Sequence, residues 1–532
     1  AMRLQMNPEK MLDTEAAGPE ILSVSHGQWL SKVMGQLRKP QAIKALRPGK
    51  TFKATLRDYQ QVGVNWLGLL HTLRLGACLA DDMGLGKTIQ VLALLNWIYG
   101  AKNRSKTTKP ASLLVIPASL LSNWIAEINR FYPNLNFLVA HPGMHPKGEL
   151  DRAETSLIEK HDLVITTYAL AGRYDFLKTH KWYYLILDEA QAIKNPGTKQ
   201  TRTLKQYNTQ NRLILTGTPI ENRLSDLWSL FDFINPGLLG SAAEFKRFAK
   251  TLDRDRSRYG ILRQLIRPYI LRRLKTDKQV IRDLPAKVEM KTYTDLSAKQ
   301  VVLYKNLVDS LAKTLEEKDG MQRRGLILSA LMKFKQLCNH PDQYLDGNGY
   351  GEAESGKFGR LREVCRTIRE KRERVLVFTQ FKEIIDPLCR FLAEVFHRQG
   401  VFLHGGVPVK KRKAVIDEFQ GENYVPFMVL SLKAGGVGLN LTRANHVIHF
   451  DRWWNPAVEN QATDRAFRIG QKKKVLVHKF IANGTIEEKI DSMIEDKQQL
   501  SKDVIAAGSE DWITEMDNEK VMELFRLSLP ER

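Results

Sequence analysis

Apolar runs and stretches of helical periodicity alternate along most of this chain. Short continuous runs of Val, Ile and Leu predict strands that are buried on both faces, as in a parallel sheet. The intervening stretches predict amphipathic helices at Asp58–Leu73, with Val62, Trp66, Leu69 and Leu70 on one face, and at Leu120–Arg130. In the first half we expect strands at Ala77–Ala80, Ser112–Ile116, Asp162–Thr167, Tyr184–Leu187 and Arg212–Leu215.

The pattern changes after Asn235-Pro236-Gly237. Residues 240 to 350 are mostly helical in pattern, and basic residues are dense there at Arg267, Arg272, Arg273 and Lys275. The strand–helix alternation then resumes, and a charged helical tail follows from Ile486. The second group of predicted strands is Arg374–Phe378, Val401–His404, Phe427–Ser431, His446–Phe450 and Val475–Phe480.

The predicted fold class is therefore α/β, with two parallel-sheet lobes and helical protrusions inserted between them. Ligands bind at the carboxyl ends of the strands in such sheets, which is where the polar motifs of this chain fall. We assign the chain to a helical lead-in (1–50), a first lobe (51–236), helical protrusions and linker (237–355), a second lobe (356–495) and a helical tail (496–532).

A glycine-rich stretch, Asp81–Thr88, separates the strand at Ala77–Ala80 from the helix that contains Ile89–Leu95. Glycines let the backbone wrap a phosphate chain, and the amide groups and dipole of the following helix favour negative charge. Lys87 is placed to reach the terminal phosphates and Thr88 to bind Mg²⁺. The full P-loop pattern asks for glycine at position 81, where this chain has aspartate, so the match is partial.

Three further polar groups lie at the right places to complete a nucleotide site. Asp188-Glu189 ends an apolar strand, which fits a carboxylate that holds Mg²⁺ followed by one that orients and deprotonates water. Thr216-Gly217-Thr218 ends the next strand and is suited to sensing a γ-phosphate. Gln60 offers the donor and acceptor that pair with an adenine edge.

Two arginines near the end of the second lobe, Arg465 and Arg468, are three residues apart and would share one face of a helix. Paired guanidiniums suit the charge that builds up on a transferring phosphoryl group. A pair of surface arginines is the simpler reading. The need for a group that closes over nucleotide held by the first lobe favours the functional one.

Composition adds one strong feature. The chain has 532 residues, 43% hydrophobic and 27% charged, and a formal net charge of +23. Solvated basic helix faces explain a single run of Lys and Arg, but an excess of this size in a phosphate-handling protein favours a nucleic-acid partner.

Other classes find no support in the sequence. No apolar run approaches the roughly 20 residues of a membrane span, and the start lacks a secretory signal. Ala1-Met2 resembles a tag remnant, so an excised fragment is expected. The four cysteines show no paired spacing, which predicts neither disulfides nor zinc. Cys338-Asn339-His340 could suggest a metal site, but no second Cys-x-x-Cys or His pair lies within reach by spacing, so a packed loop between the lobes is predicted. A cytoplasmic location, at a bacterial nucleoid, and no membrane partner are expected.

In this order the motifs resemble the ATPase motor of the Swi/Snf family of helicase superfamily two, with the bacterial branch the nearest. The resemblance covers roughly residues 52 to 490. Gln191 stands where many members have His, so its coupling role is left open, and Asp82 replaces the usual Glu. The blocks that carry the resemblance are Asp81–Thr88, Asp188–Gln191, Ile193–Pro196, Leu215–Asn222, Asp226–Leu230, Leu337–Pro341, Ala434–Leu441 and Trp454–Pro456.

The resemblance implies two RecA-like lobes that bind ATP and Mg²⁺. Lys87, Asp188, Glu189 and the arginine fingers Arg465 and Arg468 would be catalytic, with Thr88 and Asp188 on the metal. Nucleotide contacts would come from Gln60, Asp82, Met83, Gly84, Leu85, Gly86, Lys87, Thr88 and Gly438. Contacts with DNA would come from Pro117, Ser119, Thr167, Tyr168, His404, Gly405, Gly406, Lys433, Gly435 and Trp454.

We therefore expect a DNA-dependent ATPase: a monomeric motor that translocates on double-stranded DNA and remodels protein–DNA complexes. DNA-bound proteins or RNA polymerase are the expected targets. Two alternatives stay open at this point. One is a helicase that separates DNA or RNA strands, and the other is a nucleic-acid-binding scaffold with a vestigial ATP site.

Overall fold

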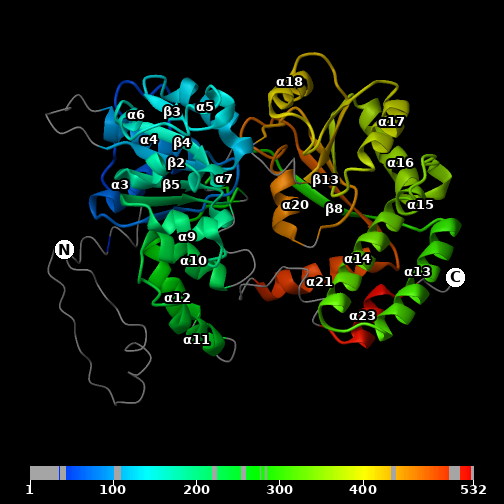
Figure 1. The fold of residues 1–532 in the computed structure, drawn as a ribbon. Helices are drawn as coiled ribbons and strands as arrows, with labels where there is room; N and C mark the ends of the chain where they lie inside the picture. Colours follow the sequence, from blue (N-terminus) through cyan, green and yellow to red (C-terminus); the bar gives the residue numbers. More distant parts are fainter. Residues whose placement is uncertain are drawn as a thin grey trace. The chain divides into compact units, whose positions relative to one another are not determined.

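The chain forms two compact units, Ala1–Arg282 and Asp283–Arg532, which are described separately (Figure 1). The boundary falls inside the segment 237–355 that the sequence assigns to protrusions and linker. The computed structural model describes residues 35, 43–100, 110–217, 224–252, 259–275, 277–278, 280–281, 284–432, 439–453, 455–501 and 516–528. Most of the predicted lead-in, 1–50, lies outside these residues.

The first unit is built on a seven-stranded sheet with strand order β3-β4-β2-β5-β6-β1-β7, in which every pairing is parallel. The interior strands β2 and β4 are buried at every position, as expected for a sheet covered on both faces. The strands are β1 (Ala77–Leu79), β2 (Ser112–Ile116), β3 (Phe137–Val139), β4 (Leu163–Thr167), β5 (Trp182–Asp188), β6 (Thr209–Leu215) and β7 (Ile270–Leu271).

Helices follow most strands of this unit. Below the sheet in Figure 1 lie α10, then α12 and, farthest from the sheet, α11. The helix bounds are α3 (Asp58–Thr72), α4 (Lys87–Tyr99), α5 (Leu121–Phe131), α6 (Ser156–Glu159), α7 (Tyr168–Ala171), α8 (Asp175–Thr179), α9 (Lys199–Gln206), α10 (Leu224–Ile234), α11 (Ala242–Leu252) and α12 (Tyr259–Ile266). Short 3₁₀ turns include η3 (Ala118–Leu120) and η5 (Ala190–Ile193).

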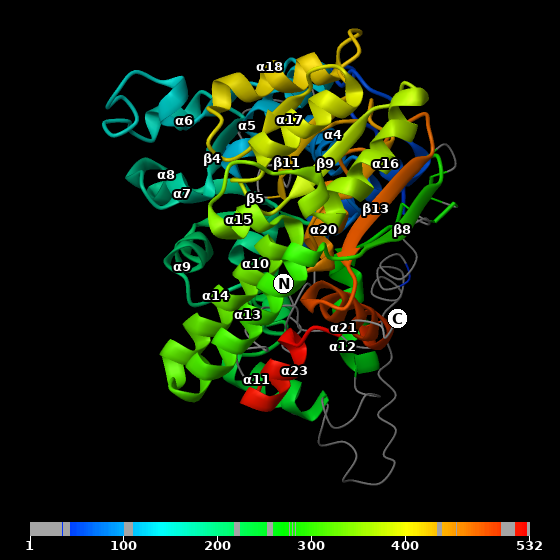
Figure 2. The ribbon, with the colours of Figure 1, turned by 90° about the vertical axis from the view of Figure 1, so that its right-hand side faces the viewer.

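The second unit has a six-stranded parallel sheet with strand order β10-β11-β9-β12-β13-β8. The long strands β13 and β8 pair along its edge (Figure 2). The strands are β8 (Lys287–Thr294), β9 (Val375–Thr379), β10 (Val401–Leu403), β11 (Phe427–Ser431), β12 (His446–His449) and β13 (Val475–Ala482).

A helical subdomain belongs to this second unit. Helices α13, α14, α21 and α23 share one apolar core around Tyr304, Phe334 and Phe525. The helices of the unit are α13 (Ala298–Glu316), α14 (Gly320–Asn339), α15 (Pro341–Leu345), α16 (Gly356–Glu370), α17 (Ile385–Phe396), α18 (Val409–Gln420), α20 (Pro456–Thr463), α21 (Ile486–Ser501) and α23 (Asn518–Phe525). None of the helices in the described ranges combines the length and apolarity needed to cross a bilayer.

The fold class predicted from the sequence, α/β with two parallel-sheet lobes, is confirmed. The sequence analysis missed three edge strands. β3 and β7 contain three and two residues, too few for a pattern. β8 lies in the region assigned to helices, although its charged and apolar side chains alternate over its first five residues as in a partly covered strand.

Candidate nucleotide site

The glycine-rich loop connects the end of β1 to the start of α4, as its sequence predicts. Gly84 and Gly86 have φ angles of 84° and 82°, a left-handed conformation that glycine adopts without steric cost. Gly86 is the N-cap of α4, and Lys87 is the first residue of the helix. The Lys87 Nζ donates to the Asp81 carbonyl at 2.7 Å, which holds the ammonium group over the loop.

The aspartate at position 81, which departs from the P-loop pattern, is a buried structural residue. Its side chain is fully buried and receives hydrogen bonds from Arg273 Nε at 2.8 Å and from Gln90 Nε2 at 3.1 Å. Arg273 Nη2 also bonds to Asp81 and, at 2.8 Å, to Gln90 Oε1. Arg273 thus neutralises the carboxylate and ties the loop to the first turns of α4.

The backbone that follows β7 also lies along the loop. The Asp82 N–H donates to the Arg273 carbonyl at 3.0 Å, and the Lys275 N–H donates to Asp82 Oδ2 at 3.0 Å. In the sequence, Arg273 and Lys275 stand out only as part of a basic stretch. Their role has no local signal, because it depends on β7 pairing with β1.

Gln60, predicted to contact adenine, is buried beside the same loop. Its Nε2 donates to the Leu85 carbonyl at 3.1 Å and lies 3.3 Å from the Tyr59 hydroxyl, while its Oε1 accepts from the Arg57 N–H at 3.0 Å. The Tyr59 hydroxyl donates to the same Leu85 carbonyl at 2.9 Å. The amide therefore supports the loop in this structure, and the adenine contact stays a prediction.

Asp188 ends β5 and is buried. The Trp124 Nε1 donates to Asp188 Oδ2 at 2.8 Å, and the Glu189 N–H donates to Oδ1 at 2.9 Å. Burial, followed by the charge of Glu189, raises the pKa of Asp188 to about 7, although Trp124 and Lys87 oppose the shift. A carboxyl group whose pKa lies this close to neutral pH releases its proton readily when a cation binds.

A chain of hydrogen bonds links Glu189 to the end of β6. Glu189 has a φ of 51°, a left-handed conformation that is strained for a residue with a Cβ. Gln191 Nε2 donates to Glu189 Oε2 at 2.9 Å, and the Thr216 hydroxyl donates to Gln191 Oε1 at 3.3 Å. A Cβ on Gly217 would lie 3.0 Å from Met83, so this turn also abuts the glycine loop.

The residues at this sheet edge fit a nucleoside triphosphate with Mg²⁺. The left-handed glycines and the N-terminus of α4 suit a phosphate chain, and Lys87 supplies a cation. The hydroxyl of Thr88 and the carboxylate of Asp188 are hard oxygen donors, the type that Mg²⁺ takes.

The predicted arginine fingers lie in the second unit, but not on a helix. Helix α20 ends at Thr463, and Arg465 and Arg468 follow it in consecutive turns, so the expected shared helical face is wrong. The Arg465 side chain is buried, and Arg468 Nη1 donates to the Leu439 carbonyl at 3.4 Å. The helical spacing argument fails because the chain turns directly after Thr463.

The predicted DNA residues differ in exposure. Pro117 and Ser119 are half-buried at the turn that leads into α5, and Gly405 and Gly406 are exposed after β10, next to half-buried His404. Thr167 and Tyr168 are buried, and the Tyr168 hydroxyl donates to the Asp188 carbonyl at 2.8 Å. Lys433, Gly435, Gly438 and Trp454 lie outside the described residues.

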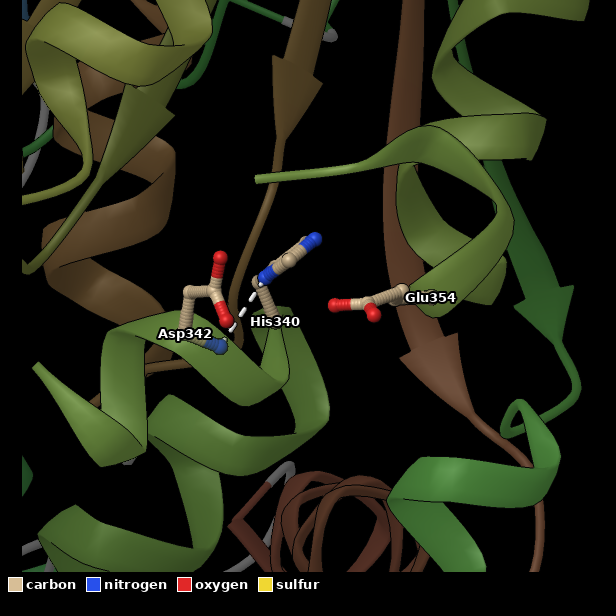
Figure 3. Close-up of side chains that lie close together, drawn as sticks. All are labelled: His340, Asp342 and Glu354. Atoms are coloured by element: carbon tan, nitrogen blue, oxygen red, sulfur yellow. Dashed lines mark hydrogen bonds between the residues drawn. The ribbon is translucent and has the colours of Figure 1, made fainter. Parts of the chain in front are cut away.

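A separate cluster of His340, Asp342 and Glu354 has the ligand types of a metal site (Figure 3). The His340 Nδ1 accepts from the Asp342 N–H at 3.0 Å, and its Nε2 donates to the Gly351 carbonyl at 3.0 Å. Burial lowers the pKa of His340, which keeps the ring neutral. Lys299 Nζ lies 2.9 Å from Glu354 and places a cation beside the cluster. Cys338 and Asn339 are the last residues of α14 and His340 follows them, so the loop predicted for these residues is the end of a helix.

Two parallel-sheet units, with a glycine loop and a strand-end Asp-Glu pair in the first, define a helicase-type ATPase. Comparison with known proteins specifies the family. Residues 59–343 match the family described as "SNF2-related domain", and residues 356–470 match "Helicase conserved C-terminal domain". The chain belongs to the SNF2-related family.

Relatives from bacteria and yeast are similar over most of the chain. It is 45% identical over 509 residues to the "Putative ATP-dependent helicase/translocase YwqA" of Bacillus subtilis, covering 94% of this chain and 54% of that protein. It is 34% identical to the "ISWI chromatin-remodeling complex ATPase ISW2" of Saccharomyces cerevisiae, covering 87% and 42%. The chain thus spans about half the length of these relatives.

Among solved structures, the "Sulfolobus solfataricus SWI2/SNF2 ATPase core in complex with dsDNA" is 40% identical. It covers 92% of this chain and 100% of that one, with a TM-score of 0.45.

Proposed function

We propose that this chain is an ATP-dependent double-stranded DNA translocase that couples hydrolysis to remodelling of protein–DNA complexes. The observation that carries the proposal is the convergence of the glycine loop, Asp188-Glu189 and Thr216 in one network, in a member of the SNF2-related family. The chromatin-remodelling relative in yeast supports the remodelling class. The chain acts as a monomeric motor in the cytoplasm, at the nucleoid.

In the proposed reaction, Lys87 and the amide groups at the start of α4 hold the phosphates of ATP. Thr88 and Asp188 would hold Mg²⁺, which would supply positive charge beside the phosphates. Glu189 takes a proton from the water that attacks the γ-phosphorus, and ADP leaves with the electron pair of the broken P–O bond. Arg465 and Arg468 stabilise the charge that develops on the transferring group.

The DNA part of the proposal rests on charge and on the family. A net charge of +23 attracts a polyanion, and contacts with phosphates carry no sequence information. Binding should therefore be independent of sequence and should weaken steeply as salt rises. The exposed Gly405 and Gly406 and the turn at Pro117 and Ser119 are the proposed phosphate contacts among the described residues.

The decisive experiment measures ATP hydrolysis alone and with duplex DNA, single-stranded DNA or RNA. Duplex DNA should stimulate most, and Lys87→Ala should abolish the activity. Lys178→Ala is the matched control, because this lysine only pairs with Asp175 on the surface, at 2.8 Å. A triplex-displacement assay then tests movement along the duplex.

The same experiment tests the alternatives. The bacterial relative is named a helicase as well as a translocase, so stimulation by single strands or RNA, with strand displacement, would favour a strand-separating helicase. Nucleotide binding with no hydrolysis under any condition would favour a scaffold with a vestigial site.

A further inference from the structure

The Mg²⁺-binding carboxylate of the proposed site is held by an indole from a neighbouring helix. Trp124 lies on α5, its side chain is fully buried, and its Nε1 donates to Asp188 Oδ2 at 2.8 Å. An indole N–H can only donate and does not titrate at physiological pH. It therefore fixes one carboxylate oxygen in place and favours the charged form.

Asp188 makes two further hydrogen bonds, one from a backbone N–H to its side chain and one from a tyrosine hydroxyl to its main-chain carbonyl. The Glu189 N–H donates to Oδ1 at 2.9 Å, and the Tyr168 hydroxyl donates to the Asp188 main-chain carbonyl at 2.8 Å. The Tyr168 contact holds the main chain at the end of β5, whereas the Glu189 N–H and the Trp124 indole each hold one oxygen of the carboxylate. Each oxygen keeps a lone pair that a cation can use.

The position of α5 makes this contact more than a packing detail. The helix packs against α4, which carries Lys87 and Thr88. It begins directly after the turn η3, which contains Ser119 and follows Pro117. Helix α5, which carries Trp124, therefore connects the turn predicted to contact DNA with Asp188 at the end of β5.

We propose that Trp124 is a positioning residue that presents the Asp188 carboxylate to Mg²⁺. The inference rests on the proposed function, because it assigns to Asp188 the metal that the ATPase reaction needs. Without the indole donor the carboxylate keeps only the Glu189 N–H bond to Oδ1, so Oδ2 is no longer held in place. The loss then appears in Mg²⁺ affinity rather than in the affinity for nucleotide without metal.

Trp124→Phe removes the donor while keeping an aromatic side chain, and Trp182→Phe is a matched control. Trp182 is also fully buried, and its Nε1 donates to the Leu177 carbonyl at 2.9 Å, away from Asp188. Trp124→Leu removes the same donor with a different shape. Circular dichroism and denaturant unfolding compare the folding of all three variants.

The readout is binding of a fluorescent ADP analogue to the full chain, titrated with Mg²⁺ and repeated in EDTA. Trp124→Phe and Trp124→Leu should both raise the Mg²⁺ concentration at half-saturation about 10-fold, the size expected for one hydrogen bond to a charged group. Binding in EDTA should change less than about 2-fold, which is about 0.4 kcal/mol by the same conversion. Trp182→Phe should change neither quantity.

Equal effects in Mg²⁺ and in EDTA, or equal effects of the Trp124 and Trp182 variants, would overturn the inference and leave the proposed function standing. If the wild-type chain shows no Mg²⁺-dependent binding, the proposed function fails, and the inference fails with it.

Discussion

Arg273 forms an ion pair with the fully buried Asp81, 192 residues earlier in the chain. This pair anchors the first residue of the glycine loop. Removing one partner of a buried pair leaves an uncompensated charge, which costs about 3–5 kcal/mol. We expect Arg273→Ala to lower the free energy of unfolding by that amount. Asp81→Gly, added to Arg273→Ala, should recover part of the loss because it removes the stranded carboxylate.

Denaturant unfolding of the single and double variants measures this effect. Arg173→Ala is the control, because it breaks an exposed ion pair with Asp151 (3.2 Å) and should cost less than about 1 kcal/mol. A double variant that is less stable than Arg273→Ala alone would contradict the explanation.

The left-handed backbone at Glu189 predicts that glycine is more stabilising than alanine at this position, the reverse of the usual order. Glycine ordinarily costs about 0.5–1 kcal/mol relative to alanine. At a φ of 51°, however, Glu189→Gly should be more stable than Glu189→Ala by about 1 kcal/mol. Both variants should lose hydrolysis while still binding nucleotide. Thermal unfolding of the two variants tests the order, and equal stability would show that this conformation carries no strain.

Gln191 has to donate to Glu189 and accept from Thr216 at the same time. Gln191→Ala should lower stimulated ATP turnover about 10-fold with little change in the KM for ATP, since it disturbs Glu189, the carboxylate proposed to activate water, and not the proposed phosphate contacts. Gln191→Glu should be worse, because it places two carboxylates side by side. Gln191→His keeps a donor and an acceptor and should retain most activity. Steady-state kinetics decides, and a rise in KM alone would be the contrary result.

Acid sensitivity is expected at the β8–β13 edge. Burial raises the pKa of Glu289, but Lys479 and Lys287 outweigh it and lower the pKa to about 2. A lowered pKa stabilises the fold above the unfolded value of 4.5, and the stabilisation is lost as pH falls towards 2. The difference in urea midpoint between wild type and Glu289→Gln should therefore shrink from pH 6 to pH 3.5. The exposed Glu418→Gln serves as control, and a constant difference would refute the assignment.

The sequence predicts what local patterns determine. Strands such as Ser112–Ile116 and Phe427–Ser431 are confirmed to the residue, because both faces of each are buried and the apolar run is continuous. The loop geometry at Gly84 and Gly86 likewise follows from glycine at those positions.

Long-range partners could not be predicted in the same way. Trp124 and Arg273 reach their carboxylates from 64 and 192 residues away, so neither contact has a periodic signal. The helix assumed for Arg465 and Arg468 is wrong because spacing alone does not reveal where α20 ends.

The last strand of the second sheet comes from the chain before the helical subdomain: β8 pairs with β13 over eight residues, yet the "Helicase conserved C-terminal domain" match begins only at residue 356. A protein cut at that point would present β13 as a bare hydrogen-bonding edge, the surface on which strands of other molecules aggregate. The excisable module is therefore longer than its sequence family implies. It starts near residue 284, and helices α13 and α14 are carried within it as an insertion.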